Sequence, residues 1–263
     1  MGRTGFDDGN NNAAARARDR EEKCALNTAV CVADIRKKVV TLQPQYEHRQ
    51  QTKSLVMSNV LLINGSPHGV GGCTQTALEE VARTLNSEHI DTQIVHIGHR
   101  DIRGCIACYK CAERGRCVFD DEVNRVAPLF EQADGLVVGS PVYYGSAAGT
   151  LVSFLDRLFF STPFSKRMKV GAAVVSARRA GTTATFDQLN KYFTISEMPI
   201  ASSRYWNMVH GRTAEDVLKD EEGIQCMRIL GRNMAFLIRA IDAERQRNGL
   251  PMQEETVYTN FIR

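Results

Sequence analysis

The sequence lacks any long apolar run and any strong excess of charge. None of its apolar stretches reaches the roughly 20 residues that a membrane-spanning helix requires. The formal net charge of +3 is too small to indicate nucleic-acid binding. The first residues do not combine a charged stretch, an apolar core and a small-residue cleavage site. We therefore expect a cytoplasmic protein that binds neither membrane nor nucleic acid.

Motifs for several common kinds of chemistry are also missing. The glycine-rich segment 64–76 contains neither the Gly-Lys-Ser/Thr of a nucleoside-triphosphate loop nor the G-x-G-x-x-G of a dinucleotide-binding loop. No Ser/His/Asp order and no pair of catalytic carboxylates stands out. Eight cysteines in 263 residues are too few for a disulfide scaffold. We therefore predict no catalytic side chain.

Half of these cysteines lie in one short stretch with the spacing C-x2-C-x2-C-x5-C: Cys105, Cys108, Cys111 and Cys117. Four thiols this close can reach one small inorganic centre, either an iron-sulfur cluster or a structural zinc ion. Two successive C-x2-C steps favour the cluster, because zinc sites more often place two cysteine pairs far apart in the sequence. The spacing alone leaves cluster, zinc, disulfides and free thiols open.

Residues 1–56 differ from the rest of the chain. They show no steady helical or strand period, and they carry ten Lys/Arg against seven Asp/Glu, which accounts for the whole net charge. We expect a disordered extension, with a partner-binding basic arm as the alternative. Met57 directly precedes the first predicted strand and is a candidate for the true translation start. The folded domain is then expected to span residues 57–263.

From Met57 onward, short apolar strands alternate with amphipathic helices. The predicted strands are 60–63, 92–97, 135–139, 170–175 and 199–203, and the predicted helices are 74–85, 122–131, 151–160, 186–193 and 213–244. The last helix is expected to be capped at Thr213 and broken at Gly223. This alternation indicates a parallel sheet covered on both faces. Five strands and five helices predict an α/β, flavodoxin-like doubly wound five-stranded parallel sheet.

Ligands of such sheets bind at the carboxyl ends of the strands. The first strand is followed by a glycine-rich loop in which Ser66, Thr74 and Thr76 offer hydroxyl groups. The next helix points free N–H groups and its positive dipole end at this loop, so the segment predicts a phosphate cradle. Cys73 stands at the start of that helix, where the dipole favours a thiolate, but we assign it no chemical role.

Two further strand ends carry candidate site residues. Segment 139–146 combines small residues with Tyr143 and Tyr144, which could wrap a flat aromatic ring. Segment 176–183 contains Arg178 and Arg179, which could meet an anion such as a ring edge or a cofactor phosphate. An ordinary surface turn is the alternative for each of these two segments, and a glycine-rich turn without a ligand is the alternative for the first loop. Asp156 and Arg157 are expected to form an ion pair on a helix surface or at a subunit interface.

Five motifs together resemble the NAD(P)H-dependent FMN reductase family, and more narrowly its iron-sulfur flavoprotein branch. They are Gly65–His68, the cysteine run followed by Asp120-Asp121, Ser140–Tyr143, Phe154–Arg157 and Thr259–Arg263. The resemblance covers about Met57 to Arg263. It implies a flavodoxin-like fold, bound FMN, redox chemistry, and a homodimer or homotetramer.

The resemblance also implies a role for particular residues. The positions where the family holds the FMN phosphate are Ser66, His68, Thr74, Gln75 and Thr76. Those that hold the isoalloxazine are Pro141, Val142, Tyr143, Tyr144 and Gly145, and the branch's 4Fe-4S ligands are Cys105, Cys108, Cys111 and Cys117. We add Ser176, Arg178 and Gly181 of the third loop as cofactor contacts. His68 stands where many relatives carry arginine. Because histidine loses its charge as the pH rises, phosphate binding is expected to weaken at higher pH.

The leading hypothesis is an FMN-dependent oxidoreductase that takes electrons from NAD(P)H or a ferredoxin-like donor. It passes them to a small molecule or a protein, with a 4Fe-4S cluster able to divide a two-electron step into single electrons. The flavin carries the chemistry, which agrees with the lack of a catalytic side chain. The alternatives are a non-enzymatic FMN and iron-sulfur electron-transfer protein and a zinc-stapled regulatory domain.

Overall fold

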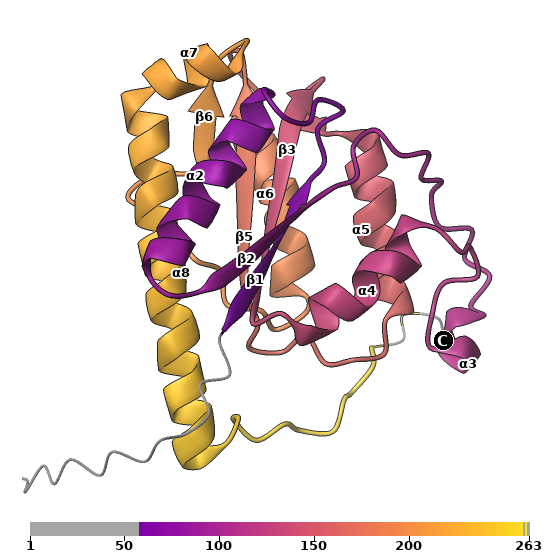
Figure 1. The fold of residues 1–263 in the computed structure, drawn as a ribbon. Coiled ribbons are helices and arrows are strands. Elements are labelled where there is room, and N and C mark those ends of the chain that lie inside the picture. The colour runs from indigo at the N-terminus through magenta and orange to yellow at the C-terminus, as the bar shows by residue number, and fades with distance from the viewer. Residues whose placement is uncertain (1–57, 260, 262–263) are drawn as a thin grey trace, which may run out of the picture. The chain divides into compact units, whose positions relative to one another are not determined.

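Five parallel strands in the order β2-β1-β3-β5-β6 form the central sheet (Figure 1). The computed structural model describes residues 58–259 and 261, so the expectations for residues 1–56 and for Met57 lie outside the described residues. The strands are β1 (Asn59–Asn64), β2 (Asp91–His96), β3 (Gly135–Tyr143), β5 (Val170–Ala177) and β6 (Met208–His210). A two-residue strand, β4 (Ser146–Ala147), pairs antiparallel with the end of β3. This strand order confirms the predicted flavodoxin-like fold.

Helices cover both faces of the sheet. One layer contains α2 (Cys73–Ser87), α7 (Ala214–Lys219) and α8 (Glu221–Asn248), and the other contains α4 (Glu122–Gln132), α5 (Gly149–Ser161) and α6 (Thr182–Thr194). A single-turn helix, α3 (Cys111–Arg114), lies within the cysteine-rich segment. None of the helices in the described part of the chain is both long and apolar enough to cross a membrane.

Strand β1 shows why the strand segments read as continuous apolar runs. Leu61 and Ile63 pack into the core beneath α4 and α5, whereas Val60 and Leu62 pack into the core beneath α2 and α8. Successive side chains of a strand point to opposite faces, and both faces are covered here. The buried strands therefore appear in the sequence as continuous apolar runs, without alternating polar residues.

The sequence misplaced the last strand. Segment 199–203 forms only an isolated bridge, between Ile200 and Gly171, and the fifth parallel strand is β6. Because β6 has three residues, it is too short to show a strand period in the sequence. The break in the long helix falls at Asp220 rather than at Gly223, since the Asp220 carboxylate accepts the N–H of Gly223 and caps α8. The Thr213 cap is confirmed: its hydroxyl accepts the N–H of Asp216.

Candidate functional site

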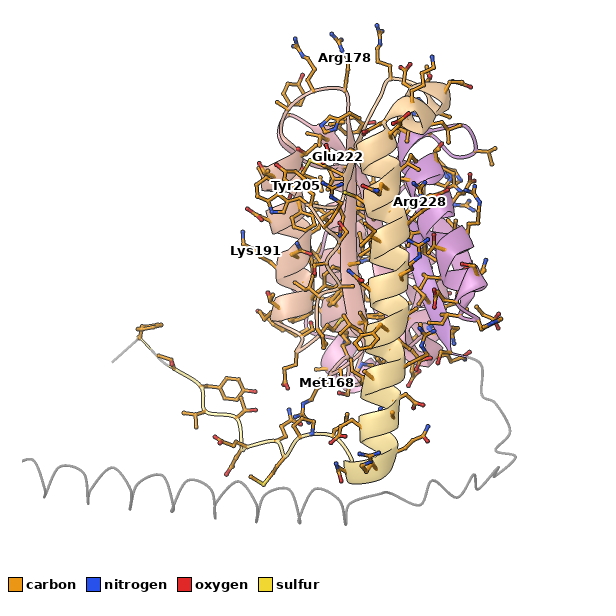
Figure 2. All side chains as sticks on the ribbon, turned by 90° about the vertical axis from the view of Figure 1, so that its left-hand side faces the viewer. Met168, Arg178, Lys191, Tyr205, Glu222 and Arg228 are labelled. Carbon is orange, nitrogen blue, oxygen red and sulfur yellow. The ribbon has the colours of Figure 1, made fainter. Side chains whose placement is uncertain are left out.

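An open pocket of about 450 Å³ lies at the carboxyl ends of β1, β3, β5 and β6. It brings together the three loops that the sequence singled out and a fourth loop, residues 211–213, that it did not. Figure 2 shows Arg178 at this end of the molecule, opposite Met168. The predicted site residues that line the pocket are Ser66, His68, Thr74, Pro141, Val142, Tyr143, Ser176 and Arg178.

Asn64, the last residue of β1, organises the first loop. Its buried side chain accepts the N–H of Ser66 at 2.9 Å, donates to Gln75 Oε1 at 2.8 Å and donates to the His68 carbonyl at 3.4 Å. The Ser66 hydroxyl in turn accepts the N–H of His68 at 3.2 Å. One side chain therefore satisfies groups at three points of the loop and fixes its course past the pocket.

Helix α2 begins at the floor of this pocket. Gly72 occupies its N-cap position without a side-chain hydrogen bond, so the N–H groups of the first turn face the loop. The Thr74 hydroxyl lies 2.8 Å from the hydroxyl of Ser176, and both residues are buried. This contact joins the first loop to the end of β5. It leaves one hydroxyl hydrogen of the pair free, and this hydrogen together with the free amides forms a set of donors suited to an anion.

Three loops surrounding the pocket carry basic side chains. Arg178 lies after β5, Arg212 lies after β6 and His68 lies after β1, and all three are exposed at the pocket. In the described part of the chain, neither arginine forms an ion pair with a carboxylate. Both guanidinium groups are therefore available to a negatively charged ligand.

Other predicted contacts have side chains engaged elsewhere. The amide of Gln75 is bonded to Asn64 and donates to Glu79, and the Thr76 hydroxyl donates to the carbonyl of Gly72. Their hydroxyl and amide groups hold the loop and the helix turn, so any contact of Gln75 or Thr76 with a ligand would have to use the backbone. Neither side chain lines the pocket.

The turn between β3 and β4 is a tight hairpin. Tyr144 and Gly145 both have positive φ, 52° and 74°, as a two-residue type I′ turn requires. The Tyr144 ring is fully exposed, while Tyr143 borders the pocket. Gly181 packs against this hairpin: a Cβ there would lie 2.8 Å from Val142 Cγ1. The absence of a side chain at Gly181 therefore allows the third loop to pack directly against the second loop.

Sequence reasoning missed two residues at the end of β2 and just after it that contact the first loop. His96 Nε2 lies 2.6 Å from the Ser66 carbonyl, and a Cβ on Gly98 would lie only 2.0 Å from that same oxygen. Gly98 was recognisable as a glycine directly after a predicted strand. The Gly211-Arg212-Thr213 loop was missed because the preceding strand was misplaced.

The surroundings of Cys73 do not favour the thiolate that the helix dipole alone would favour. Burial raises the pKa of this thiol, and the nearby carboxylates of Asp216 and Glu215 raise it further. A hydrogen bond from the helix amide acts in the opposite direction but is outweighed. The Cys73 thiol instead donates to the Gly211 carbonyl at 3.6 Å, where it joins α2 to the fourth loop. Cys73 is therefore a structural residue of the pocket wall.

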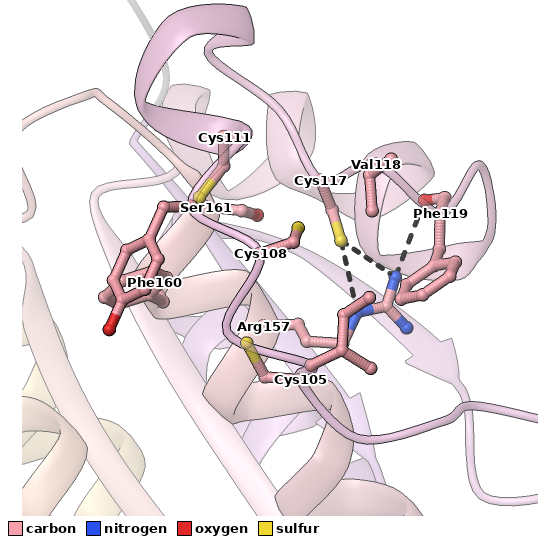
Figure 3. A pocket seen from close by; sticks show the side chains of 11 residues that line it. Cys105, Cys108, Cys111, Cys117, Val118, Phe119, Arg157, Phe160 and Ser161 are labelled. Atoms are coloured by element: carbon pink, nitrogen blue, oxygen red, sulfur yellow. Dashed lines mark hydrogen bonds between the residues drawn. The ribbon is translucent and has the colours of Figure 1, made fainter.

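The four clustered cysteines line a second, smaller pocket together with Arg157, Phe160 and Ser161 of α5 (Figure 3). Cys105 and Cys108 are exposed, Cys111 is half-buried and Cys117 is buried. Within residues 58–259 and 261, no group of three or more His, Cys, Asp or Glu side chains is arranged to hold a metal ion. The thiols share a pocket but do not stand in a ligating arrangement.

Two residues of the cysteine loop have strained backbone conformations. Ala107 and Tyr109 have positive φ angles of 50° and 55°, a conformation that costs a residue with a side chain about 1–3 kcal/mol. The N–H of Ala107 donates to Cys105 Sγ at 3.4 Å. N–H groups directed at cysteine sulfurs are typical of sulfurs that ligate iron. Four thiols in one pocket, with N–H donors directed at Cys105 Sγ and, from Arg157, at Cys117 Sγ, fit an iron-sulfur cluster chemically.

The expected surface pairing of Asp156 with Arg157 is wrong. Arg157 is only 1% exposed, and its guanidinium pairs with both carboxylate oxygens of Asp121, at 2.7 and 2.9 Å. It also donates twice to Cys117 Sγ, at 3.3 and 3.2 Å. Asp156 instead accepts from the Tyr192 hydroxyl. Burial lowers the pKa of Arg157, but the bonds to Asp121 and Cys117 outweigh it and raise that pKa above its ordinary value.

Comparison with known proteins identifies the family of the chain. The family model of NADPH-dependent FMN reductase matches residues 58–213. An iron-sulfur flavoprotein of Methanocaldococcus jannaschii is 30% identical over 193 residues, which cover 69% of this chain and 98% of that protein. An iron-sulfur flavoprotein of Methanosarcina thermophila is 27% identical over 191 residues, which cover 70% and 97% of the two chains.

Solved structures show the same fold. RosB with a bound intermediate, 8-demethyl-8-formylriboflavin-5'-phosphate, matches with a TM-score of 0.58 at 15% identity, over 78% of this chain and 94% of RosB. An NADH:FMN oxidoreductase matches with a TM-score of 0.51 at 18% identity, over 70% of this chain and 90% of that enzyme. At these identities the likeness establishes the architecture alone.

Proposed function

The chain belongs to the NADPH-dependent FMN reductase family, a family of FMN-binding oxidoreductases, and we propose that it transfers electrons from a reduced nicotinamide or a reduced carrier protein to an acceptor. The pocket at the strand ends carries this proposal. It joins hydroxyl groups, the free amides of the first turn of α2 and two exposed arginines beside an aromatic hairpin. An anionic group attached to a flat ring system matches that arrangement.

The phosphate of FMN would be held by the first loop and by α2. Ser66 and Thr74 supply hydroxyl groups, and the first-turn amides supply N–H donors. Arg212 lines the same pocket from the β6–α7 loop, and the neighbouring Gly211 carbonyl accepts a hydrogen bond from Cys73 at the start of α2. Arg212 always carries a positive charge, whereas His68 carries one only when it is protonated. We therefore assign part of the phosphate binding to a loop that the family resemblance did not indicate.

The ring would lie against the second and third loops. Pro141, Val142 and Tyr143 line the pocket there, and the hairpin that follows offers backbone amides to a ring edge. Such amides stabilise negative charge that develops on a reduced ring. Bound FMN supplies the redox chemistry, accepting two electrons as hydride or one electron at a time. The protein positions it and sets its electrostatic surroundings.

A 4Fe-4S cluster on Cys105, Cys108, Cys111 and Cys117 is the second part of the proposal. The N–H donors directed at the Cys105 and Cys117 sulfurs support it, as does the relation to iron-sulfur flavoproteins. A cluster supplies one-electron transfer, and thiolate ligation needs the reducing conditions of a cytoplasm.

We also propose that the protein is a homodimer or homotetramer. Helix α5 begins beside the end of β3, where the N–H of Ala148 donates to the Ser140 hydroxyl at 3.0 Å, whereas Phe160 of the cysteine pocket lies near the end of the helix, about 16 Å farther along at 1.5 Å per residue. An apolar groove beside the cysteine loop exposes Tyr109, Phe160 and Ile195. A second copy seated there would cover this surface and could bring its own flavin pocket to the cysteine loop.

The hydroxyl groups of the first loop should determine FMN affinity. We expect Thr74→Ala or Ser66→Ala to weaken FMN binding about tenfold or more, because a hydrogen bond to a charged group contributes about 1.5–3 kcal/mol. Quenching of flavin fluorescence on titration of the apoprotein measures this. Thr84→Ala, the same change farther along α2, is the control and should leave the affinity unchanged. Wild-type affinity in both pocket variants would show that the loop has another role.

The cysteine quartet should bind iron and sulfide. Anaerobically purified protein should contain about four of each per chain. Cys108→Ala should lose them, together with the broad visible absorption, while it retains FMN. Cys226→Ala, which removes a buried core thiol on α8, should retain both. About one zinc per chain without iron would instead support a structural zinc site.

The electron donor distinguishes an enzyme from an electron carrier. We expect NADPH or NADH, mixed anaerobically with the FMN-loaded protein, to bleach the flavin absorption within the time of a catalytic turnover. Stopped-flow absorbance measures the rate. No reaction with either nucleotide, but rapid reduction by ferredoxin, would reject the nicotinamide-dependent enzyme in favour of an electron-transfer protein.

Analytical ultracentrifugation tests the oligomer. The full chain should sediment as two or four copies, and Ile195→Asp should shift it toward the monomer because a charge would be buried in the contact. Leu218→Asp, at an exposed apolar residue on α7, is the matched control. A monomeric wild-type protein would contradict the assembly without affecting the cofactor assignments.

A further inference from the structure

Arg157 is the largest fully buried side chain in the described part of the protein. A buried guanidinium is costly unless its donors and its charge are matched. The outer edge, Nη1 and Nη2, meets Asp121 in a bidentate pair. Asp121 also accepts the N–H of Val123 and caps α4, so its carboxylate is held in place. The charge of Arg157 is thereby balanced without any help from cysteine.

The other edge of the guanidinium is directed at one sulfur. Nε and Nη2 both donate to Cys117 Sγ, which belongs to a residue only 8% exposed (Figure 3). A neutral thiol is a weak hydrogen-bond acceptor. Two donors of a permanently charged group on a single buried sulfur match a sulfur that carries negative charge, as a metal-bound thiolate does.

We propose that Arg157 raises the reduction potential of the cluster by stabilising negative charge at the Cys117 sulfur. This inference rests on the proposed cluster. A cluster becomes more negative when it accepts an electron, so N–H···S bonds and a nearby positive charge stabilise the reduced state. Asp121, on the far edge of the same guanidinium, acts in the opposite direction. Arg157 is a positioning residue, since it acts through the sulfur that it contacts.

Arg157 also contacts the backbone of the cysteine segment. It donates to the carbonyl of Arg103 at 3.2 Å and to that of Phe119 at 3.5 Å, on either side of the four cysteines. A purely structural clamp would therefore lose cluster when either partner of the ion pair is changed. An electrostatic role makes a different prediction, because removing the positive and the negative partner must shift the potential in opposite directions.

The experiment is an anaerobic redox titration of the full-length, FMN-loaded protein. Dithionite supplies the electrons, and the EPR signal of the reduced cluster reports the potential. Arg157→Gln should lower the potential by about 59 mV or more, which is a tenfold smaller ratio of reduced to oxidised cluster for a one-electron couple. Asp121→Asn should raise it, and asparagine keeps the helix cap. Arg157→Lys keeps the positive charge but lacks the edge with two donors. Its cluster potential should therefore lie between those of the wild type and Arg157→Gln.

The flavin potential, measured in the same titration, is the internal control and should not move. Shifts of the same sign in Arg157→Gln and Asp121→Asn, or no shift in either, would overturn the role of Arg157 while leaving the cluster in place. If Arg157→Gln does not fold, the test uses Arg157→Lys and Asp121→Asn, whose cluster potentials should shift in opposite directions. A wild-type protein without iron and sulfide would overturn the cluster itself, and with it this inference.

Discussion

The parallel pairing of β1, β3 and β5 is the constraint on which the rest of the structure depends. In this register Asn64 lies beside Gly139, and Pro141 lies beside Ser176, so three loops leave the sheet at one edge. The N–H of Gly65 continues the pairing by donating to the Gly139 carbonyl at 2.9 Å. Because both faces of these strands are buried, a change of register would misplace apolar side chains in both layers. The position of the pocket follows from the sheet.

The cysteine loop is held by a different interaction. It lacks regular structure apart from α3, and it is fastened to α5 by one buried guanidinium that bonds Asp121, Cys117 and two carbonyls. The same helix begins next to the β3–β4 hairpin, and Val142 and Tyr143 of that hairpin line the other pocket. Helix α5 therefore fixes the separation between the proposed flavin and cluster sites. Electron transfer between the two proposed sites of one chain would have to cross that length.

The sequence predicted most of the fold because the strands are buried on both faces. Continuous apolar runs at residues 60–63, 135–139 and 170–175 could be recognised without knowledge of their neighbours. Strand β6 could not, because three residues carry no period and its pairing with β5 depends on the rest of the sheet. That error also hid Arg212, whose place at the pocket follows only from the correct last strand.

The sequence alone determined the alternation of strands and helices, the loops at the strand ends and the grouping of four thiols. These depend on local spacing and on burial. Only the tertiary structure decided which groups meet: that Asn64 shapes the first loop, that burial raises the pKa of the Cys73 thiol, and that Arg157 contacts Cys117 rather than solvent. Cys117 and Arg157 are forty residues apart in the chain. Their contact exists because the sheet places α5 beside the cysteine loop, and no local pattern encodes such a distance.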